Sequence, residues 1–144
     1  MRLPDANVLL YALDETSARH AGAKAWLDDA LSGSEEVAFA WVVLLAMLRL
    51  TTKRAVFANP LTPGEAFDVI DGWLAQPCAM LVHPTPRHES LLRGLVSSAG
   101  TAGNLTTDAH LAALSLEYGA TICSYDTDFS RFARITVVTP EQDL

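Results

Sequence analysis

Four aspartates stand where this chain could perform metal-assisted chemistry. Asp5 follows the short apolar stretch "RLP", Asp108 lies in "TTDAH", and Asp126 and Asp128 lie in "SYDTDF". Carboxylate oxygens suit Mg2+ or Mn2+ as ligands, and like charges held close together repel one another unless they are protonated or bound to a cation. If the fold brings the four together, they predict metal-assisted hydrolysis of a phosphodiester by a metal-activated water.

Each aspartate also has a purely structural interpretation. Asp5 with Asn7 could form a turn or a helix cap, and Asp108 could complement the dipole of a helix. Asp126 and Asp128 could form an Asx-turn. Taken singly, each side chain favours the structural interpretation; taken together, they predict a compact carboxylate cluster.

The elements that must position these aspartates alternate between strands and helices. The short apolar runs "RLP", "EVAFA", "AMLVH", "ATICSY" and "ITVVT" are typical of strands buried on both faces, and segments with helical spacing lie between them. This alternation predicts right-handed βαβ crossovers and one α/β domain over residues 1–144, with a mostly parallel sheet of about 4–5 strands. Ligands in such folds bind beyond the carboxyl ends of the strands, where Asp5 and Asp126 are expected.

Local signals mark several helix boundaries. Thr62, Pro63 and Glu65 form a capping-box pattern at the start of "TPGEAFDVIDGWLAQP". The dipeptide at 85–86 repeats the Thr-Pro start before another helix, and Gly119 is expected to close the helix that carries Asp108.

Composition excludes several classes of protein. Half of the 144 residues are hydrophobic and 19% are charged, which argues against disorder. The net charge of -7 argues against a large basic nucleic-acid surface. No apolar run is long enough to span a membrane, and acidic residues flank the N-terminal apolar stretch, so we expect it to be folded rather than a secretion signal. Cys78 and Cys123 are expected to be core thiols of a cytoplasmic protein.

Four segments, in this order, resemble the PIN-domain ribonucleases, and in particular the VapC-type toxins of toxin–antitoxin pairs. They are "PDANVLLYA", "WVVLLAMLRLTT", "GNLTTDAHLAAL" and "ATICSYDTDFSRF", and the resemblance covers nearly the whole chain. It implies a three-layer α/β/α sandwich and an endoribonuclease that uses Mg2+ or Mn2+ to cleave tRNA or ribosomal RNA. It also implies a homodimer that a cognate VapB-type antitoxin neutralises.

The resemblance also assigns roles to individual residues. It implies that Asp5, Asp108 and Asp126 are catalytic and bind the metal, and that Asp128 is a further acidic ligand. The implied supporting residues are Asn7, Thr107 and Ser124.

One position departs from the family pattern. Family members usually carry a glutamate in the helix after the second strand, and this position falls on Ala46 in "LLAMLRL". Glu35 and Glu36 precede the second strand, so we expect them at the opposite end of the sheet. An alternative is therefore a PIN-like protein with weak or lost catalysis that acts by binding RNA or its antitoxin.

Other polar and aromatic residues leave alternatives open. Arg49, Lys53 and Arg54 could form a solvated helix end or contact RNA phosphates or the antitoxin. The three tryptophans are expected in the core or at an interface, and the four histidines show no spacing typical of a zinc site. The motif "DTDFS" also suggests a phosphoaspartyl phosphatase. That motif belongs after an N-terminal strand with the rest of the fold downstream, whereas here it lies close to the end of the sequence.

Overall fold

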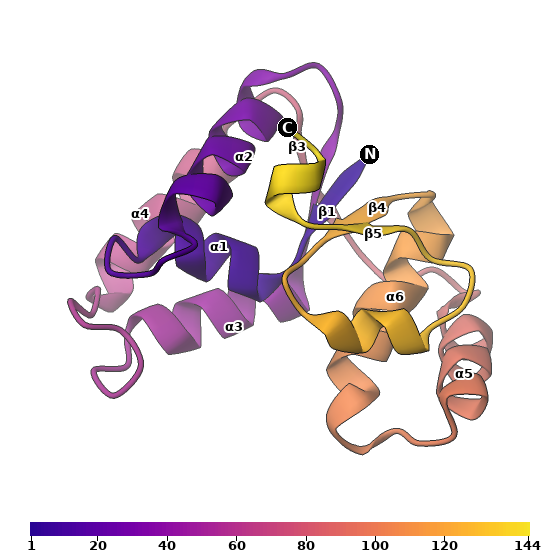
Figure 1. The fold of residues 1–144 in the computed structure, drawn as a ribbon. Helices are drawn as coiled ribbons and strands as arrows, with labels where there is room; N and C mark the ends of the chain where they lie inside the picture. The colour runs from indigo at the N-terminus through magenta and orange to yellow at the C-terminus, as the bar shows by residue number, and fades with distance from the viewer.

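A five-stranded parallel sheet forms the centre of the protein. The computed structural model describes residues 1–144, and the strand order is β3-β2-β1-β4-β5, with every pairing parallel (Figure 1). The strands are β1 (Arg2–Pro4), β2 (Val37–Ala40), β3 (Ala79–Val82), β4 (Thr121–Cys123) and β5 (Val137–Val138). The predicted parallel α/β sheet is therefore confirmed, at five strands.

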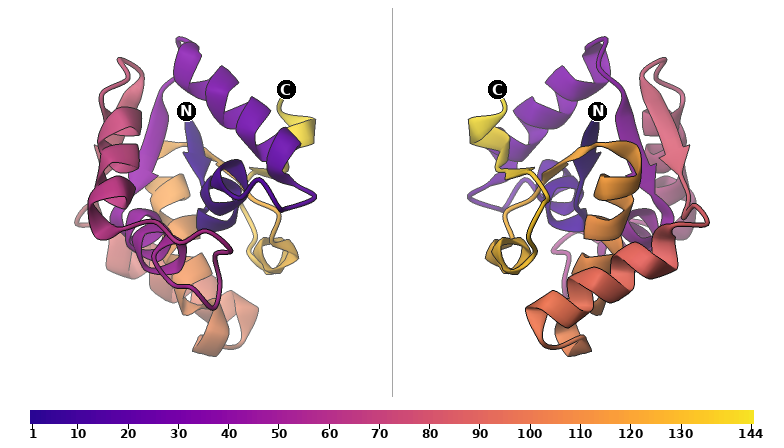
Figure 2. Two further views of the ribbon diagram at one scale, coloured as in Figure 1. Left: turned by 90° about the vertical axis from the view of Figure 1, so that its left-hand side faces the viewer. Right: turned by 90° about the vertical axis from the view of Figure 1, so that its right-hand side faces the viewer.

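Helices cover both faces of this sheet. They are α1 (Ala6–Leu13), α2 (His20–Ser32), α3 (Trp41–Thr51), α4 (Pro63–Leu74), α5 (His88–Ala99) and α6 (Thr106–Tyr118), with short 3-10 turns η1 (Gly103–Leu105), η2 (Thr127–Arg131) and η3 (Pro140–Gln142). Helices α1 to α4 pack on one another on one side, and α5 packs on α6 on the other (Figures 1 and 2). This is the three-layer α/β/α sandwich that the sequence predicted.

The core forms where the strands meet these helices. All residues of β2 are fully buried, as its uninterrupted apolar sequence requires for a strand covered on both faces. Trp26 and Trp73 are buried as expected, and the Trp73 ring stacks on Phe39 with 5.9 Å between centroids. Trp41, by contrast, is 45% exposed at the start of α3.

Most helix boundaries follow the local signals, with one exception. Both hydrogen bonds of the capping box between Thr62 and Glu65 are present, and Gly119 closes α6 with φ 64. Helix α5 begins at His88 rather than at the Thr-Pro pair. The Thr85 hydroxyl instead donates to Glu117 on α6 and accepts from the Arg87 N–H, so this pair ties the loop to α6.

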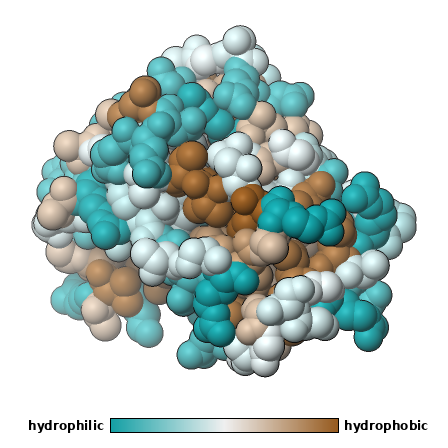
Figure 3. Space-filling model, turned by 45° about the vertical axis from the view of Figure 1, so that its right-hand side comes forward, coloured by the Kyte–Doolittle hydropathy of each residue, from teal (hydrophilic) through white to brown (hydrophobic).

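Large apolar side chains are exposed at only a few places. They are Trp41, Leu45, Val56, Phe67 and Leu144, whereas Phe57, next to Val56 in the sequence, is buried. On the face drawn in Figure 3, which brings the β4–β5 side forward, apolar surface lies in the middle between hydrophilic margins. No helix combines the length and apolarity that crossing a membrane would need.

Candidate metal centre

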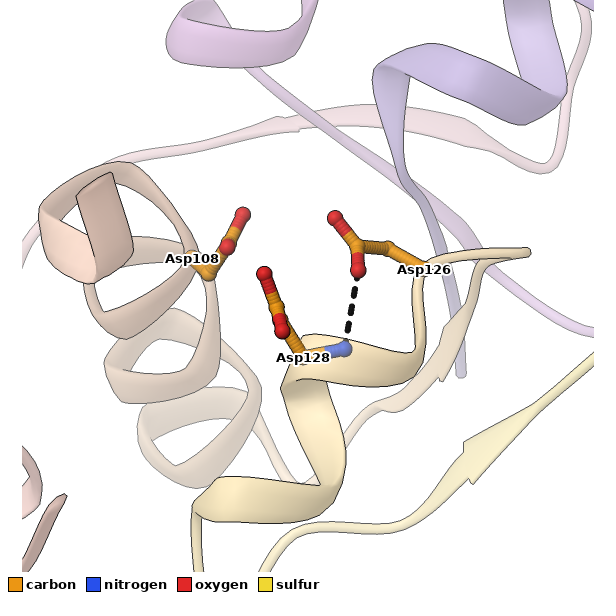
Figure 4. A group of neighbouring side chains, drawn as sticks. All are labelled: Asp108, Asp126 and Asp128. Atoms are coloured by element: carbon orange, nitrogen blue, oxygen red, sulfur yellow. Dashed lines mark hydrogen bonds between the residues drawn. The ribbon is translucent and has the colours of Figure 1, made fainter.

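Three aspartates converge beside the carboxyl ends of β1 and β4. Asp126 lies three residues beyond Cys123, the last residue of β4, Asp128 lies in η2, and Asp108 lies in the first turn of α6. One carboxylate oxygen of each lies within 4.8 Å of the others, and the three side chains point into one space (Figure 4). The predicted compact cluster is thus present in the fold.

Asp5 lies next to this cluster and is held by three hydrogen bonds. Its Oδ1 accepts from the Ala6 N–H at 2.7 Å, and its Oδ2 accepts from Asn7 Nδ2 and from the Ser124 hydroxyl, both at 2.7 Å. Asp5 therefore caps α1, and the same contacts fix the direction of its carboxylate.

Ser124 links the two strand ends that carry the aspartates. It is 2% exposed, and besides donating to Asp5 its oxygen accepts from Asn7 Nδ2 at 3.0 Å and from the Asp126 N–H at 2.9 Å. Asn7 Oδ1 in turn accepts from the Tyr125 N–H at 3.2 Å. Asn7 and Ser124, which were expected as supporting residues, thus both contact Asp5 and each other.

The carboxylates of the cluster repel one another. Burial and the nearby charges of Asp126, Asp5 and Asp128 raise the pKa of Asp108 to about 6. Burial also raises the pKa of Asp5, although hydrogen bonds from Ser124 and Ala6 oppose the effect. Both shifts have the sign expected when carboxylates share a partly buried space.

The donor set fits a hard divalent cation. Several carboxylate oxygens face one another, and the repulsion that raises the pKa of Asp108 is the interaction that a cation would reverse. Oxygen-only sites of this kind suit Mg2+ or Mn2+, which retain coordination positions for water and phosphate oxygens.

The position of the usual family glutamate opens into a hollow. Ala46, Val42, Leu45, Arg49 and Thr107 line a space of about 290 Å³ between α3 and the start of α6, which we call the α3 hollow. The Thr107 hydroxyl makes no hydrogen bond to the aspartates, unlike Asn7 and Ser124.

The nearest acidic residues in sequence do not replace that glutamate. Glu35 pairs with the N-terminal ammonium and with Arg2, at the amino end of the sheet. This placement agrees with the expected location of Glu35 at the end opposite the aspartates.

A second polar network, which was not predicted from the sequence, lies between α5 and α6. The Glu117 side chain is 0% exposed and accepts from the Thr85 N–H and hydroxyl, and Glu117 Oε2 lies 2.6 Å from His88 Nδ1. His88 Nε2 lies 2.8 Å from His110 Nδ1, so the chain of contacts joins α5 to α6. Burial favours the neutral carboxyl, but the hydrogen bonds from Thr85 and His88 prevail and lower the pKa of Glu117.

This network was invisible in the spacing of the histidines. His88 and His110 lie on different helices, so only the packing of α5 on α6 brings them together. The one local feature of the sequence that belongs to this network is the Thr-Pro pair before α5, because Thr85 bonds to Glu117 instead of capping the helix.

Comparison with known proteins decides the family. A family model described as PIN domain matches residues 2–135. The chain belongs to the PIN-domain family. Ribonuclease VapC37 of Mycobacterium tuberculosis is 52% identical over 132 residues, 92% of each chain. Ribonuclease VapC33 of the same species is 40% identical over 140 residues, 97% of this chain and 98% of the relative.

Solved structures support the PIN-domain fold independently. The crystal structure of VapBC2 from Rickettsia felis, bound to a DNA fragment from its promoter, contains a chain similar to this one with a TM-score of 0.71. The likeness covers 96% of this chain and 97% of that one at 12% sequence identity, so it shows the fold alone. The VapC-type resemblance inferred from the four sequence segments is confirmed by the close relatives.

Proposed function

We propose that this PIN-domain protein is a divalent-metal-dependent endoribonuclease toxin of the VapC type. Asp5, Asp108 and Asp126 are its catalytic carboxylates, and with Asp128 they bind Mg2+ or Mn2+. The convergence of the Asp108, Asp126 and Asp128 oxygens within 4.8 Å carries this proposal. The names of its close relatives, Ribonuclease VapC37 and VapC33, support RNA as the substrate.

The aspartates of the site supply negative charge, and Ser124 and Asn7 orient one of their carboxylates. A bound divalent ion lowers the pKa of water and offsets charge on phosphoryl oxygens. Ser124 and Asn7 hold the Asp5 carboxylate in one orientation, so little rearrangement accompanies binding. Because the pKa of Asp108 is raised to about 6, this carboxyl would hold its proton in acid, and the affinity for a cation would fall there.

The expected partners follow from the same family membership. We propose that a VapB-type antitoxin covers the carboxylate site and that the toxin is a homodimer acting on tRNA or ribosomal RNA in the cytoplasm. Structural neighbours solved as toxin–antitoxin complexes support the first of these. Half-exposed Phe67 on α4 and Val56 in the preceding loop offer apolar surface for such contacts.

Cleavage of RNA with mapped ends tests the proposed function. The purified protein is incubated with total tRNA and ribosomal RNA in Mg2+, in Mn2+ or in EDTA, and new RNA ends are sequenced. We expect metal-dependent ends that vanish in Asp108→Asn and Asp126→Asn and persist in Asp68→Asn, an exposed control on α4. Identical ends from wild type and Asp108→Asn would refute the proposal.

The alternative function, binding of RNA or antitoxin with weak or lost catalysis, is motivated by the residue at position 46. Because the Ala46 side chain offers no ligand atom, a cation would be held by the aspartates alone. RNA binding without cleavage in any metal would favour a PIN-domain protein that acts by binding, as the Ala46 substitution suggested.

A further inference from the structure

Helix α3 presents an apolar and basic stripe beside the candidate metal centre. Trp41 is 45% exposed, Leu45 is 56% exposed, and Arg49 is exposed, and these residues follow one another at intervals of four. Side chains at that interval lie on the same helix face, so the three form the α3 stripe, which spans about 12 Å along the axis at ~1.5 Å per residue.

The α3 stripe borders the α3 hollow, which reaches the first turn of α6, the helix that carries Asp108. Leu45 and Arg49 belong to both, and the far wall of the hollow is Thr107, the residue immediately before Asp108. A polynucleotide whose phosphodiester lies at the aspartates must extend over neighbouring surface, and the α3 hollow is the part of that surface formed by α3 and the start of α6. The hollow has a volume of about 290 Å³. Small-molecule sites begin at roughly 300 Å³, so a single sugar or base is an occupant of suitable size.

The charge of Arg49 is not used within the chain. The basic side chains that form ion pairs are those of Arg2, Lys24, His88 and Arg93. Arg49 has no carboxylate partner although the chain carries a net charge of -7. Arg49 lines the α3 hollow together with Thr107, and a guanidinium without a carboxylate partner at this place fits a phosphate group.

We propose that the α3 stripe and the α3 hollow bind the single-stranded RNA segment next to the scissile phosphodiester. Arg49 binds a backbone phosphate, a base stacks on Trp41, and the apolar wall at Leu45 and Ala46 accepts a sugar or base. A glutamate at position 46 would place a negative charge in this path, and alanine leaves it open. This inference rests on the proposed ribonuclease function and names where its substrate lies.

RNA binding measured without cleavage tests the inference. The probe is a fluorescein-labelled 12-nucleotide single-stranded RNA of mixed sequence, titrated in EDTA at several salt concentrations and followed by fluorescence anisotropy. We expect Arg49→Ala to weaken binding at least about fivefold and to reduce the slope of log K against log salt by about 0.7. We expect Trp41→Ala to weaken binding at least about fivefold with the slope unchanged.

A matched control and three outcomes that would overturn the inference complete the test. Arg87→Ala removes an exposed arginine from the start of α5 and should change neither affinity nor slope. Equal affinity and slope for Arg49→Ala and Arg87→Ala, or no measurable binding by wild type at low salt, would overturn the inference. It would also be overturned if Trp41→Ala converted a dimer to a monomer in light scattering while RNA affinity stayed constant, because the stripe would then be an interface between copies. RNA cleavage by wild type is scored separately, so the ribonuclease proposal can stand while this inference fails.

Discussion

Replacing Asp108 by asparagine should stabilise the protein in EDTA while removing its response to metal. The pKa of Asp108 rises from 3.8 to about 6. One unit corresponds to about 1.4 kcal/mol, so the shift represents about 3 kcal/mol before solvent screening. Because the side chain is partly exposed, we expect about 1–2 kcal/mol of stabilisation in the variant at pH 7.5. For a chain of this size that raises Tm by about 3–7 °C.

The stability gained by Asp108→Asn should depend on pH in a definite direction. Since the folded-state pKa of Asp108 lies above its unfolded value, the native state binds more protons between pH 3.8 and about 6. The contribution of this group to stability is therefore full below pH 3.8 and is lost as pH rises through about 6. The advantage of the neutral asparagine should be large at pH 7.5 and small near pH 4.

Thermal unfolding by circular dichroism, with and without Mn2+, measures both effects. Mn2+ at about 100 times its Kd should stabilise wild type by about 2.7 kcal/mol and stabilise Asp108→Asn much less. Asp68→Asn, exposed on α4, should match wild type under every condition. A lower Tm for Asp108→Asn in EDTA at pH 7.5, or an equal gain at pH 4 and pH 7.5, would refute the electrostatic reasoning.

Three further changes test other parts of the site and fold. Ser124→Ala leaves the Asp126 N–H without its partner and removes one of the two hydrogen bonds that Asp5 Oδ2 accepts. It should therefore cost about 1–3 kcal/mol in urea unfolding and weaken Mn2+ binding about tenfold in calorimetry, whereas exposed Ser130→Ala should do neither. Glu117→Gln weakens charge-assisted hydrogen bonds and should cost about 2 kcal/mol in urea unfolding at neutral pH. Because the folded-state pKa of Glu117 is lowered, this difference should shrink as pH falls below 4.5; an unchanged difference in acid, or an equal loss in exposed Glu89→Gln, would contradict the reasoning. Ala46→Glu should tighten Mn2+ binding roughly tenfold relative to Ala46→Gln, and equal affinities would mean that another group already fills that position.

The sequence predicted the sheet and the aspartate cluster because both follow from local rules. Short apolar strands alternating with helices have few arrangements other than a parallel sheet, and the carboxyl ends of its strands share one edge. Asp5 and Asp126 lie at that edge for this reason, and Asp108 reaches it from the first turn of α6.

Contacts between distant helix faces could not be predicted in the same way. The approach of His88 to His110 depends on how α5 rotates against α6, and the apolar pattern constrains that rotation only loosely. The exposure of Trp41 likewise depends on what covers α3, which composition cannot show, because a buried and an exposed tryptophan have the same sequence signal.

Asp5 shows that the structural and the functional interpretations of a residue are not exclusive. Its Oδ1 caps α1, as the structural interpretation required, and its Oδ2 accepts from Asn7 and Ser124. These stabilising contacts hold a partly buried carboxylate, whose pKa is raised, beside Asp126 and Asp108 in spite of their mutual repulsion. The hydrogen bonds that make Asp5 the cap of α1 therefore also hold its carboxylate close to Asp126 and Asp108. Without these hydrogen bonds, repulsion between the carboxylates would favour movement of the Asp5 side chain away from the other two aspartates.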